Sequence, residues 1–284
     1  MKAKELYDSL DDYFIKPGMS DDWFQYMPEL EPFLCDNFKE RNMGLACDFT
    51  ETIHKVYTAV FPSENVLRKV LNSSEEAMLF VHHASSWDLK KDPKAFGFYN
   101  MDASQLEMMR EKRISMYCLH FPLDHYSDFS TSKTLADALD IEVIRPFAHF
   151  SGADCGIIGK ANCDTVHELQ RKYSEAVGHA TKLYQYGDSE IPNRTVAVCA
   201  GGGMQTFVLQ ELIENNIRDL ITGITLKNDW SVAAHELAAN NRINIFGGTH
   251  YSNEKFACMA MCTYFKNMGI PAEFVEDEPC FEDM

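Results

Sequence analysis

A strand signal followed by a glycine-rich turn stands at Thr195-Val196-Ala197-Val198-Cys199-Ala200-Gly201-Gly202-Gly203. An apolar, β-branched run of this length that ends in glycines is typical of a short buried strand turning directly into a helix. A helix is accordingly expected over residues 204–215. Strand signals of the same kind occur at residues 78–81, 114–119 and 243–246.

Helical patterns separate these strand signals. They cover residues 132–139, 165–177, 204–215 and 231–240, and a further helix is expected after Ser252. Strands that alternate with helices indicate an α/β fold with mixed or parallel sheets. We expect a first α/β half over residues 1–146, a connecting segment over 147–194 and a second half over 195–284. The two halves are expected to form one two-lobed unit.

Composition limits the classes of partner. The chain has 284 residues, with 43 Asp and Glu against 26 Lys and Arg, a net charge of −17. Because nucleic acids and anionic membranes are polyanions, neither is expected as the main partner. A small anionic ligand at a local cationic site remains compatible with this charge. At 45% hydrophobic residues, the composition is that of a globular protein.

The ends and the cysteines indicate a compartment. The first residues carry acids and no apolar stretch of signal-peptide length, and no run approaches the length of a membrane span. The nine cysteines contain no C-x-x-C pair, so reduced, mostly buried thiols in a cytoplasmic protein are expected. Cys258 and Cys262 lie one helical turn apart and could share a metal, but core packing is the favoured interpretation.

Metal-binding side chains follow three of the four strand signals. His82 and His83 follow the strand signal at residues 78–81, and His250 and Glu254 follow the one at residues 243–246. His120, Asp124 and His125 follow the strand signal at residues 114–119. Because ligands in open α/β sheets gather at the carboxyl ends of strands, these side chains are expected to form a metal site. Imidazole with carboxylate favours Zn, Mn, Fe or Co over Ca or Mg.

Local geometry supports this grouping. Gly247 and Gly248 permit a tight turn from strand to helix, and the spacing from His250 to Glu254 is one helical turn. At the remaining strand signal, the backbone amides of the glycines at 201–203 and the following helix N-terminus could hold a phosphate or carboxylate. Close packing of strand and helix explains these glycines about as well.

These motifs resemble those of the GTP cyclohydrolase I type 2 homologues, also called the NGG-one-interacting-factor-three-like family. The similarity extends over most of the chain in family order. The matching pieces are residues 42–45, 79–83, 120–124, 156–159, 195–202, 220–223 and 248–254.

The resemblance implies two similar α/β domains with mixed sheets, assembled in a toroidal homohexamer. It also implies two divalent metal ions held by a shared set of five ligands, with either Asp124 or Glu254 bridging the ions. The five implied ligands are His82, His83, Asp124, His250 and Glu254. His120 matches a family position beside the metal ligands.

The leading functional hypothesis is a dinuclear metal-dependent hydrolase in which the two ions share a hydroxide. His120 or His125 would carry a proton to the leaving group. Family names favour a small heterocyclic or nucleotide-like substrate. The alternatives are a non-enzymatic, metal-binding hexamer with an interaction or regulatory role, and a GTP cyclohydrolase.

The chain departs from the family pattern around the expected site. Phe61 stands where an acid is common, Ile224 and Thr225 follow Gly223 where the family has an acid, and residues 130–132 lack a usual Asn. The aromatic-rich segment over residues 16–41 is longer than usual. This segment could cover the entrance of the hexameric ring or bind a partner. The favoured interpretation is that its aromatic residues pack on the first domain. These changes alter the expected pocket wall.

Overall fold

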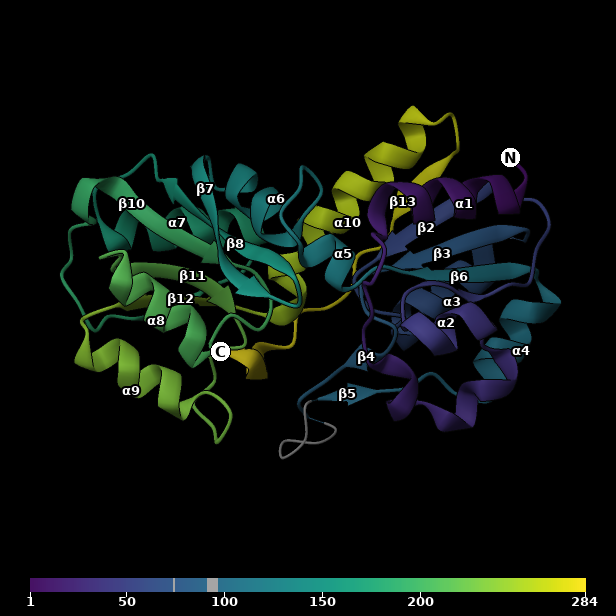
Figure 1. Cartoon of the computed structure of the whole chain (residues 1–284), viewed down its shortest axis with the longest axis horizontal. Helices are drawn as coiled ribbons and strands as arrows, with labels where there is room; N and C mark the ends of the chain where they lie inside the picture. Colours follow the sequence, from purple (N-terminus) through teal and green to yellow (C-terminus); the bar gives the residue numbers. More distant parts are fainter. Residues whose placement is uncertain (74, 91–96) are drawn as a thin grey trace. The chain divides into compact units, whose positions relative to one another are not determined.

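The computed structural model describes residues 1–73, 75–90 and 97–284 and divides them into two compact units (Figure 1). We call residues 1–123 and 258–278 unit 1, and residues 124–257 and 279–284 unit 2. Each unit has its own sheet and its own hydrophobic core.

Unit 1 is built on a five-stranded sheet of order β1-β6-β3-β2-β13. β1 is antiparallel to β6, and the other neighbours are parallel. Helices α3 (Glu64–Ser73) and α4 (Ala103–Glu111) make the crossovers between the parallel strands. The strands are β1 (Gly44–Cys47), β2 (Lys55–Ala59), β3 (Ala77–Val81), β6 (Ile114–Cys118) and β13 (Ala272–Phe274).

Alternate side chains of this sheet enter two different layers. Leu79 and Val81 face a core formed with α3, α4, α2 (Asp36–Arg41) and the 3-10 helices η1 (Trp23–Tyr26) and η2 (Pro28–Phe33). Phe80 packs instead on Tyr117 and on Phe265 of α10 (His250–Asn267), and Tyr117 stacks on Tyr7 of α1 (Ala3–Phe14). A short hairpin of β4 (Ser86–Trp87) and β5 (Phe98–Tyr99) completes the unit.

Unit 2 contains a six-stranded mixed sheet of order β7-β8-β10-β11-β12-β9. The three central strands β10, β11 and β12 are parallel, and β8 and β9 flank them in antiparallel orientation. The strands are β7 (Glu142–Phe150), β8 (Ala153–Lys160), β9 (Lys182–Tyr184), β10 (Thr195–Cys199), β11 (Asp219–Gly223) and β12 (Asn244–Gly248).

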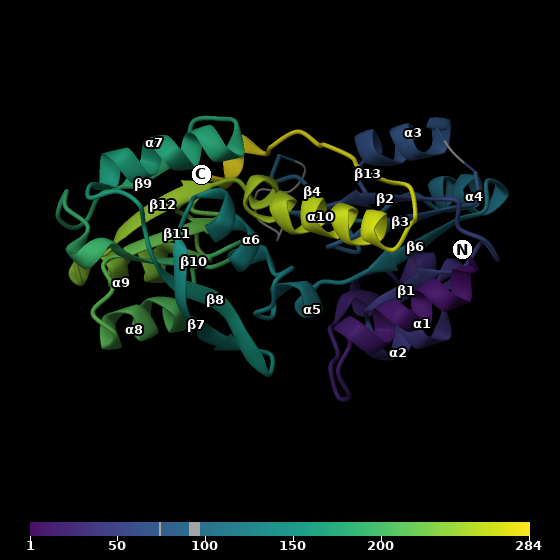
Figure 2. The same ribbon diagram turned by 90° about the horizontal axis from the view of Figure 1, so that it is seen from above.

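Helices cover both faces of this sheet (Figure 2). α6 (Thr131–Ala138) and α7 (Val166–Val177) pack on Val196, Val198 and Ile221. α8 (Thr206–Glu214) and α9 (Val232–Asn240) pack on Ala197 and Leu220, the alternate residues of the same strands. Short helices α5 (Phe121–Asp124), η3 (Pro192–Arg194) and η4 (Phe281–Asp283) lie in the connections. Both units are therefore β-α-β-α-β cores with added strands, and the predicted α/β class with two similar domains and mixed sheets is confirmed.

The predicted strands and helices are confirmed, but the chain divides differently from the predicted scheme. Residues 147–194 are not a connector, because they supply β8, β9 and the end of β7 (147–150) to the second sheet, and α7, which packs on it. Asp124 belongs to unit 2, and part of α10 with β13 returns to unit 1. β7 shows little alternation of buried and exposed residues, so its sequence pattern does not predict a strand.

Two further expectations concern the cysteines and the membrane. All nine cysteines lie in the described part of the chain, and no disulfide joins them. Cys258 is buried and its Sγ donates to the Ala59 carbonyl at 3.2 Å, in keeping with a packing role. Among the described residues, no helix combines the length and apolar character needed to cross a membrane.

Candidate metal centre

A cluster of three histidines lies at the carboxyl edge of the unit 1 sheet. His82 and His83 follow β3, and His120 follows the neighbouring strand β6. One ring nitrogen of each histidine lies within 4.8 Å of the other two. The backbone amides of His82 and His83 donate to the carbonyls of Ala59 and Val60, so the chain is held just past the strand and both rings reach the same edge.

The first histidine of this cluster has a defined orientation. His82 is buried, and its Nδ1 lies 2.9 Å from the Leu119 carbonyl oxygen. Because a carbonyl can only accept, Nδ1 carries the proton and Nε2 carries the lone pair. This is the pattern by which backbone carbonyls orient metal-binding imidazoles.

His120 is oriented by a carboxylate that the sequence did not single out. Its Nδ1 lies 2.7 Å from Asp21 Oδ2, and the Asp21 side chain is only 1% exposed. Asp21 also accepts from the Trp23 indole N–H at 3.1 Å and the Asp22 amide at 2.9 Å. Burial opposes ionisation of Asp21, but the charge and hydrogen bond of His120, with the two N–H donors, outweigh it and lower the pKa of this carboxyl.

Aromatic rings form the wall around His83. Phe61 stacks on the His83 ring at 4.8 Å between centroids, and Trp23 and Phe98 contact it at 5.8 and 5.4 Å. Phe61 is one of the positions where the sequence departs from the family pattern, and it replaces an expected acid with an apolar face.

The segment over residues 16–41 packs on the first domain, as the favoured interpretation held. Trp23, Leu30 and Phe38 are buried in the unit 1 core, whereas Tyr26 is exposed. Sequence reasoning missed that this segment also delivers Asp21 and Trp23 to His120. No local spacing signals that contact, because 99 positions separate Asp21 from His120.

Unit 2 carries a second donor set at the start of α10. His250 and Glu254 are both buried, and His250 Nε2 lies 3.3 Å from Glu254 Oε1. The helix begins at His250, so the predicted one-turn spacing is confirmed. Asp283 accepts from the His250 backbone amide at 2.7 Å and stabilises this helix start.

The glycine-rich turn after β10 makes room for Glu254. Gly201 has φ +67°, and a Cβ at this position would collide with Glu254 Oε1 and lie 3.7 Å from the His250 ring. Gly203 is similarly enclosed by Thr222 and Cys199. The structure therefore supports the close-packing interpretation of these glycines over the phosphate-binding one.

Asp124 and His125 lie at the beginning of unit 2 and are both half-buried. Asp124 Oδ1 accepts from the Thr131 hydroxyl at 2.9 Å. Thr131 belongs to the segment 130–132, where the family pattern has an Asn, and its hydroxyl holds the carboxylate. A role for His125 in proton transfer stays a prediction.

The donor chemistry fits a transition metal. Unit 1 offers three imidazoles, and unit 2 offers an imidazole and two carboxylates in His250, Glu254 and Asp124. Neutral imidazole suits Zn, Fe and Co, and added carboxylate oxygens extend the range to Mn. The buried His and Glu side chains could therefore bind a metal ion.

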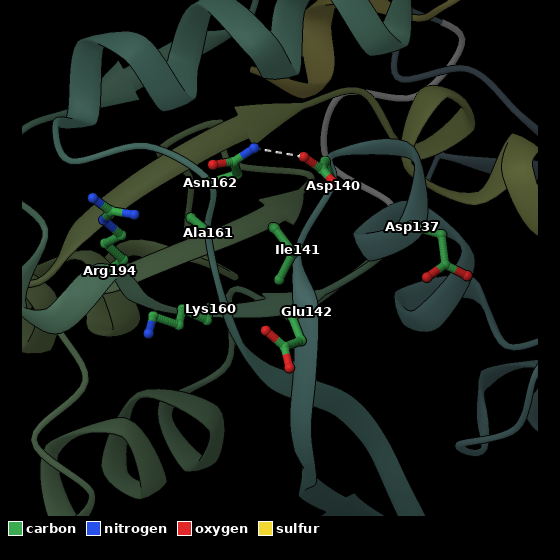
Figure 3. A pocket seen from close by; sticks show the side chains of 8 residues that line it. All are labelled: Asp137, Asp140, Ile141, Glu142, Lys160, Ala161, Asn162 and Arg194. Carbon is green, nitrogen blue, oxygen red and sulfur yellow. Dashed lines mark hydrogen bonds between the residues drawn. The ribbon is translucent and has the colours of Figure 1, made fainter.

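A separate polar cavity of about 370 Å³ lies in unit 2 (Figure 3). Lys160 and Arg194 line this cavity beside Thr195, the first residue of β10. Gly201 and Glu254 lie at the other end of this strand, beyond its last residue, Cys199. Its charged groups are largely engaged already, since Arg194 pairs with Asp164 at 2.6 Å and Asp140 accepts from Asn162 at 2.8 Å. This cavity does not compete with the histidine cluster as a metal site.

The family model described as Duf34/NIF3 (NGG1p interacting factor 3) matches residues 23–279. The chain belongs to the Duf34/NIF3 family. Its curated relatives include two archaeal proteins called GTP cyclohydrolase 1 type 2 homolog. The one from Archaeoglobus fulgidus is 27% identical over 240 residues, which cover 83% of this chain and 89% of the relative. The one from Pyrococcus horikoshii is 26% identical over 244 residues, covering 84% and 90%.

Solved structures share the fold of this Duf34/NIF3 protein. The protein ybgI, titled as of unknown function, matches with a TM-score of 0.75 at 18% identity, covering 99% of this chain and 100% of its own. TTHA1606 from Thermus thermophilus matches with a TM-score of 0.68 at 21% identity, covering 98% and 99%. At these identities the likeness establishes the fold alone.

Proposed function

We propose that this Duf34/NIF3 protein is a dinuclear metal-dependent hydrolase that acts on a small heterocyclic or nucleotide-like molecule. The observation that carries the proposal is the pair of buried donor sets at strand ends, one rich in imidazole and one containing carboxylates. Buried ionisable groups are costly unless they are paired or bind an ion, so their burial in both units favours a metal site over chance.

The proposed ligands of the two ions are the five expected from the sequence. They are His82, His83, Asp124, His250 and Glu254. Two divalent ions, when bound, polarise a substrate oxygen and lower the pKa of water to about 7.

Residues of the chain itself supply orientation, a dry wall and proton transfer. The Leu119 carbonyl holds His82 in one tautomer, and the Gly201 turn leaves room for the Glu254 carboxylate. Phe61 and Trp23 exclude water from one side of His83. His120 or His125 is proposed to hand a proton to the leaving group.

The test combines metal analysis with turnover. Protein purified without oxygen is analysed for bound metals, then assayed with phosphoesters, cyclic amides and purines in the presence of Mn, Zn or Fe. His83→Ala and Glu254→Ala are expected to lower both metal content and turnover, while His54→Ala, an exposed histidine paired with Glu76, is expected to lower neither. Full turnover in excess chelator, with metal confirmed absent, refutes the proposal.

The name carried by the curated relatives favours GTP as one substrate to include. Hydrolytic ring opening of GTP releases formate, which is measured directly. If every substrate class is inert although metal is bound, the non-enzymatic alternative of a metal-binding hexamer replaces the hydrolase. The proposed hexamer is checked by light scattering of the eluted protein.

A further inference from the structure

We propose that His120 is itself a metal ligand, and that Asp21 positions it, so that unit 1 contributes three imidazoles to the metal centre. This inference rests on the proposed metal site and adds one ligand and one positioning residue to it. It also narrows the proton-transfer role to His125, since the His120 nitrogen that faces the cluster would be occupied.

The geometry of His120 supports a ligand role. One of its ring nitrogens lies within 4.8 Å of donor nitrogens of both His82 and His83, a separation that one ion can bridge. Its Nδ1 is engaged by Asp21, so that in the neutral imidazole, the form that binds a metal, Nε2 carries the lone pair. His82 is oriented in the same sense by the Leu119 carbonyl. Two imidazoles of the cluster are thus held as Nε2 donors before any ion binds.

Hydrogen bonds of its backbone and side chain hold Asp21 within unit 1. Its backbone amide donates to the Arg41 carbonyl at 3.0 Å, and its side chain accepts from His120, Trp23 and the Asp22 amide. Trp23 packs edge-on against both His83 and His120. The segment over residues 16–41 therefore brings a carboxylate and an indole to the same edge as the metal cluster.

A carboxylate behind a metal-binding histidine fixes the ring and raises its basicity. A third imidazole in the ligand set favours ions that accept nitrogen donors, such as Zn²⁺ and Co²⁺, over Mn²⁺ or Mg²⁺. We therefore expect the metal centre to bind Co²⁺ and Zn²⁺ more tightly than Mn²⁺.

The test uses the full chain and Co²⁺ as a visible probe. Co²⁺ is titrated into metal-free protein, and its absorption spectrum and dissociation constant are measured, with X-ray absorption to count the imidazole ligands. His120→Gln is expected to remove one imidazole and shift the absorption bands. Asp21→Asn is expected to weaken Co²⁺ binding by about 10- to 100-fold while retaining the imidazole count.

The matched control is Asp22→Asn, because this exposed carboxylate neighbours Asp21 and accepts hydrogen bonds from Gln25 and Tyr26. It should bind Co²⁺ as the parent does. Near-ultraviolet circular dichroism of each variant confirms folding, and a second replacement, His120→Asn, is used if the first fails to fold.

Two results separate this inference from the proposed function. If His120→Gln leaves the Co²⁺ spectrum, affinity and imidazole count unchanged while His83→Ala lowers metal content, His120 is not a ligand and only this inference is refuted. If His83→Ala and Glu254→Ala also leave metal content unchanged, the proposed function fails as well.

Discussion

Replacement of Gly201 by alanine tests whether the turn after β10 exists to accommodate Glu254. Two costs are expected. An L-residue at φ +67° loses about 1–2 kcal/mol relative to glycine. In addition, the new Cβ collides with Glu254 Oε1, which must move away from the position it shares with His250. Metal affinity is therefore expected to fall by about 10- to 100-fold, the range seen when a ligand loses its support.

Two other glycines of unit 2 separate these costs. Gly178 has φ +85°, and a Cβ added there would have no atom within 4 Å, so Gly178→Ala carries the backbone cost alone. Gly202 is not among the glycines with positive φ, and its Cβ would make only an ordinary contact with Trp230 at 3.7 Å. Gly202→Ala therefore carries neither cost and serves as the neutral control.

Stability is measured by urea unfolding and metal affinity by Co²⁺ titration. Gly178→Ala should lose about 1–2 kcal/mol and bind metal normally. Gly201→Ala should lose at least as much stability and, alone among the three variants, bind metal more weakly. If Gly201→Ala binds Co²⁺ as tightly as the parent, Glu254 either moves without consequence or is not a ligand, and the explanation of this turn is wrong.

Three further predictions follow from buried groups and from the metal. Burial, with the nearby charge of Asp188, raises the pKa of Asp219 to about 6, against the hydrogen bond from Asn244. The folded state holds this proton more tightly than the unfolded state does, so protonation of Asp219 stabilises the fold at low pH, and this stabilisation is lost as pH rises from about 4 to 6. The amide introduced by Asp219→Asn cannot titrate. The free energy of unfolding of the parent, minus that of the variant, should therefore fall by up to about 3 kcal/mol over this range. A pH-independent difference would contradict the assignment. Tyr173→Phe removes the hydroxyl that donates to Asn253 at 3.0 Å and should cost about 1–3 kcal/mol in urea unfolding; a loss below about 0.5 kcal/mol, the effect of a surface change, would contradict it. Chelation should lower the melting temperature, since metal at about 100 times its dissociation constant adds about 2.7 kcal/mol, and an unchanged temperature would show that no ion is bound.

The elements that sequence alone identified are those encoded by local periodicity. The four apolar strand signals and the helices between them are present within a few residues of their expected bounds. His82 and His83 directly follow β3, and His250 follows β12 after Thr249, so their place at a sheet edge could be predicted from chain order. The Gly247-Gly248 turn and the spacing to Glu254 indicated a helix here, but α10 begins at His250, a little before the start predicted after Ser252.

Other features required the tertiary structure. The division into units depends on which sheet the hairpin of β7 and β8 joins, and its edge strand lacks the alternation that would mark a buried face. Asp124 belongs to unit 2, whereas His120, four residues earlier, belongs to unit 1. Their closeness along the chain therefore could not predict that they lie in different units.

The site itself shows the same limit. His120 and Gly201 were visible as residues, but their partners Asp21 and Glu254 lie 99 and 53 positions away. Local sequence determines where a strand ends and which side chains are offered there, because burial alternates with the backbone period. Which carboxylate orients a given imidazole, and which glycine must lack a Cβ, depends on close packing of distant segments, and only the folded chain decides it.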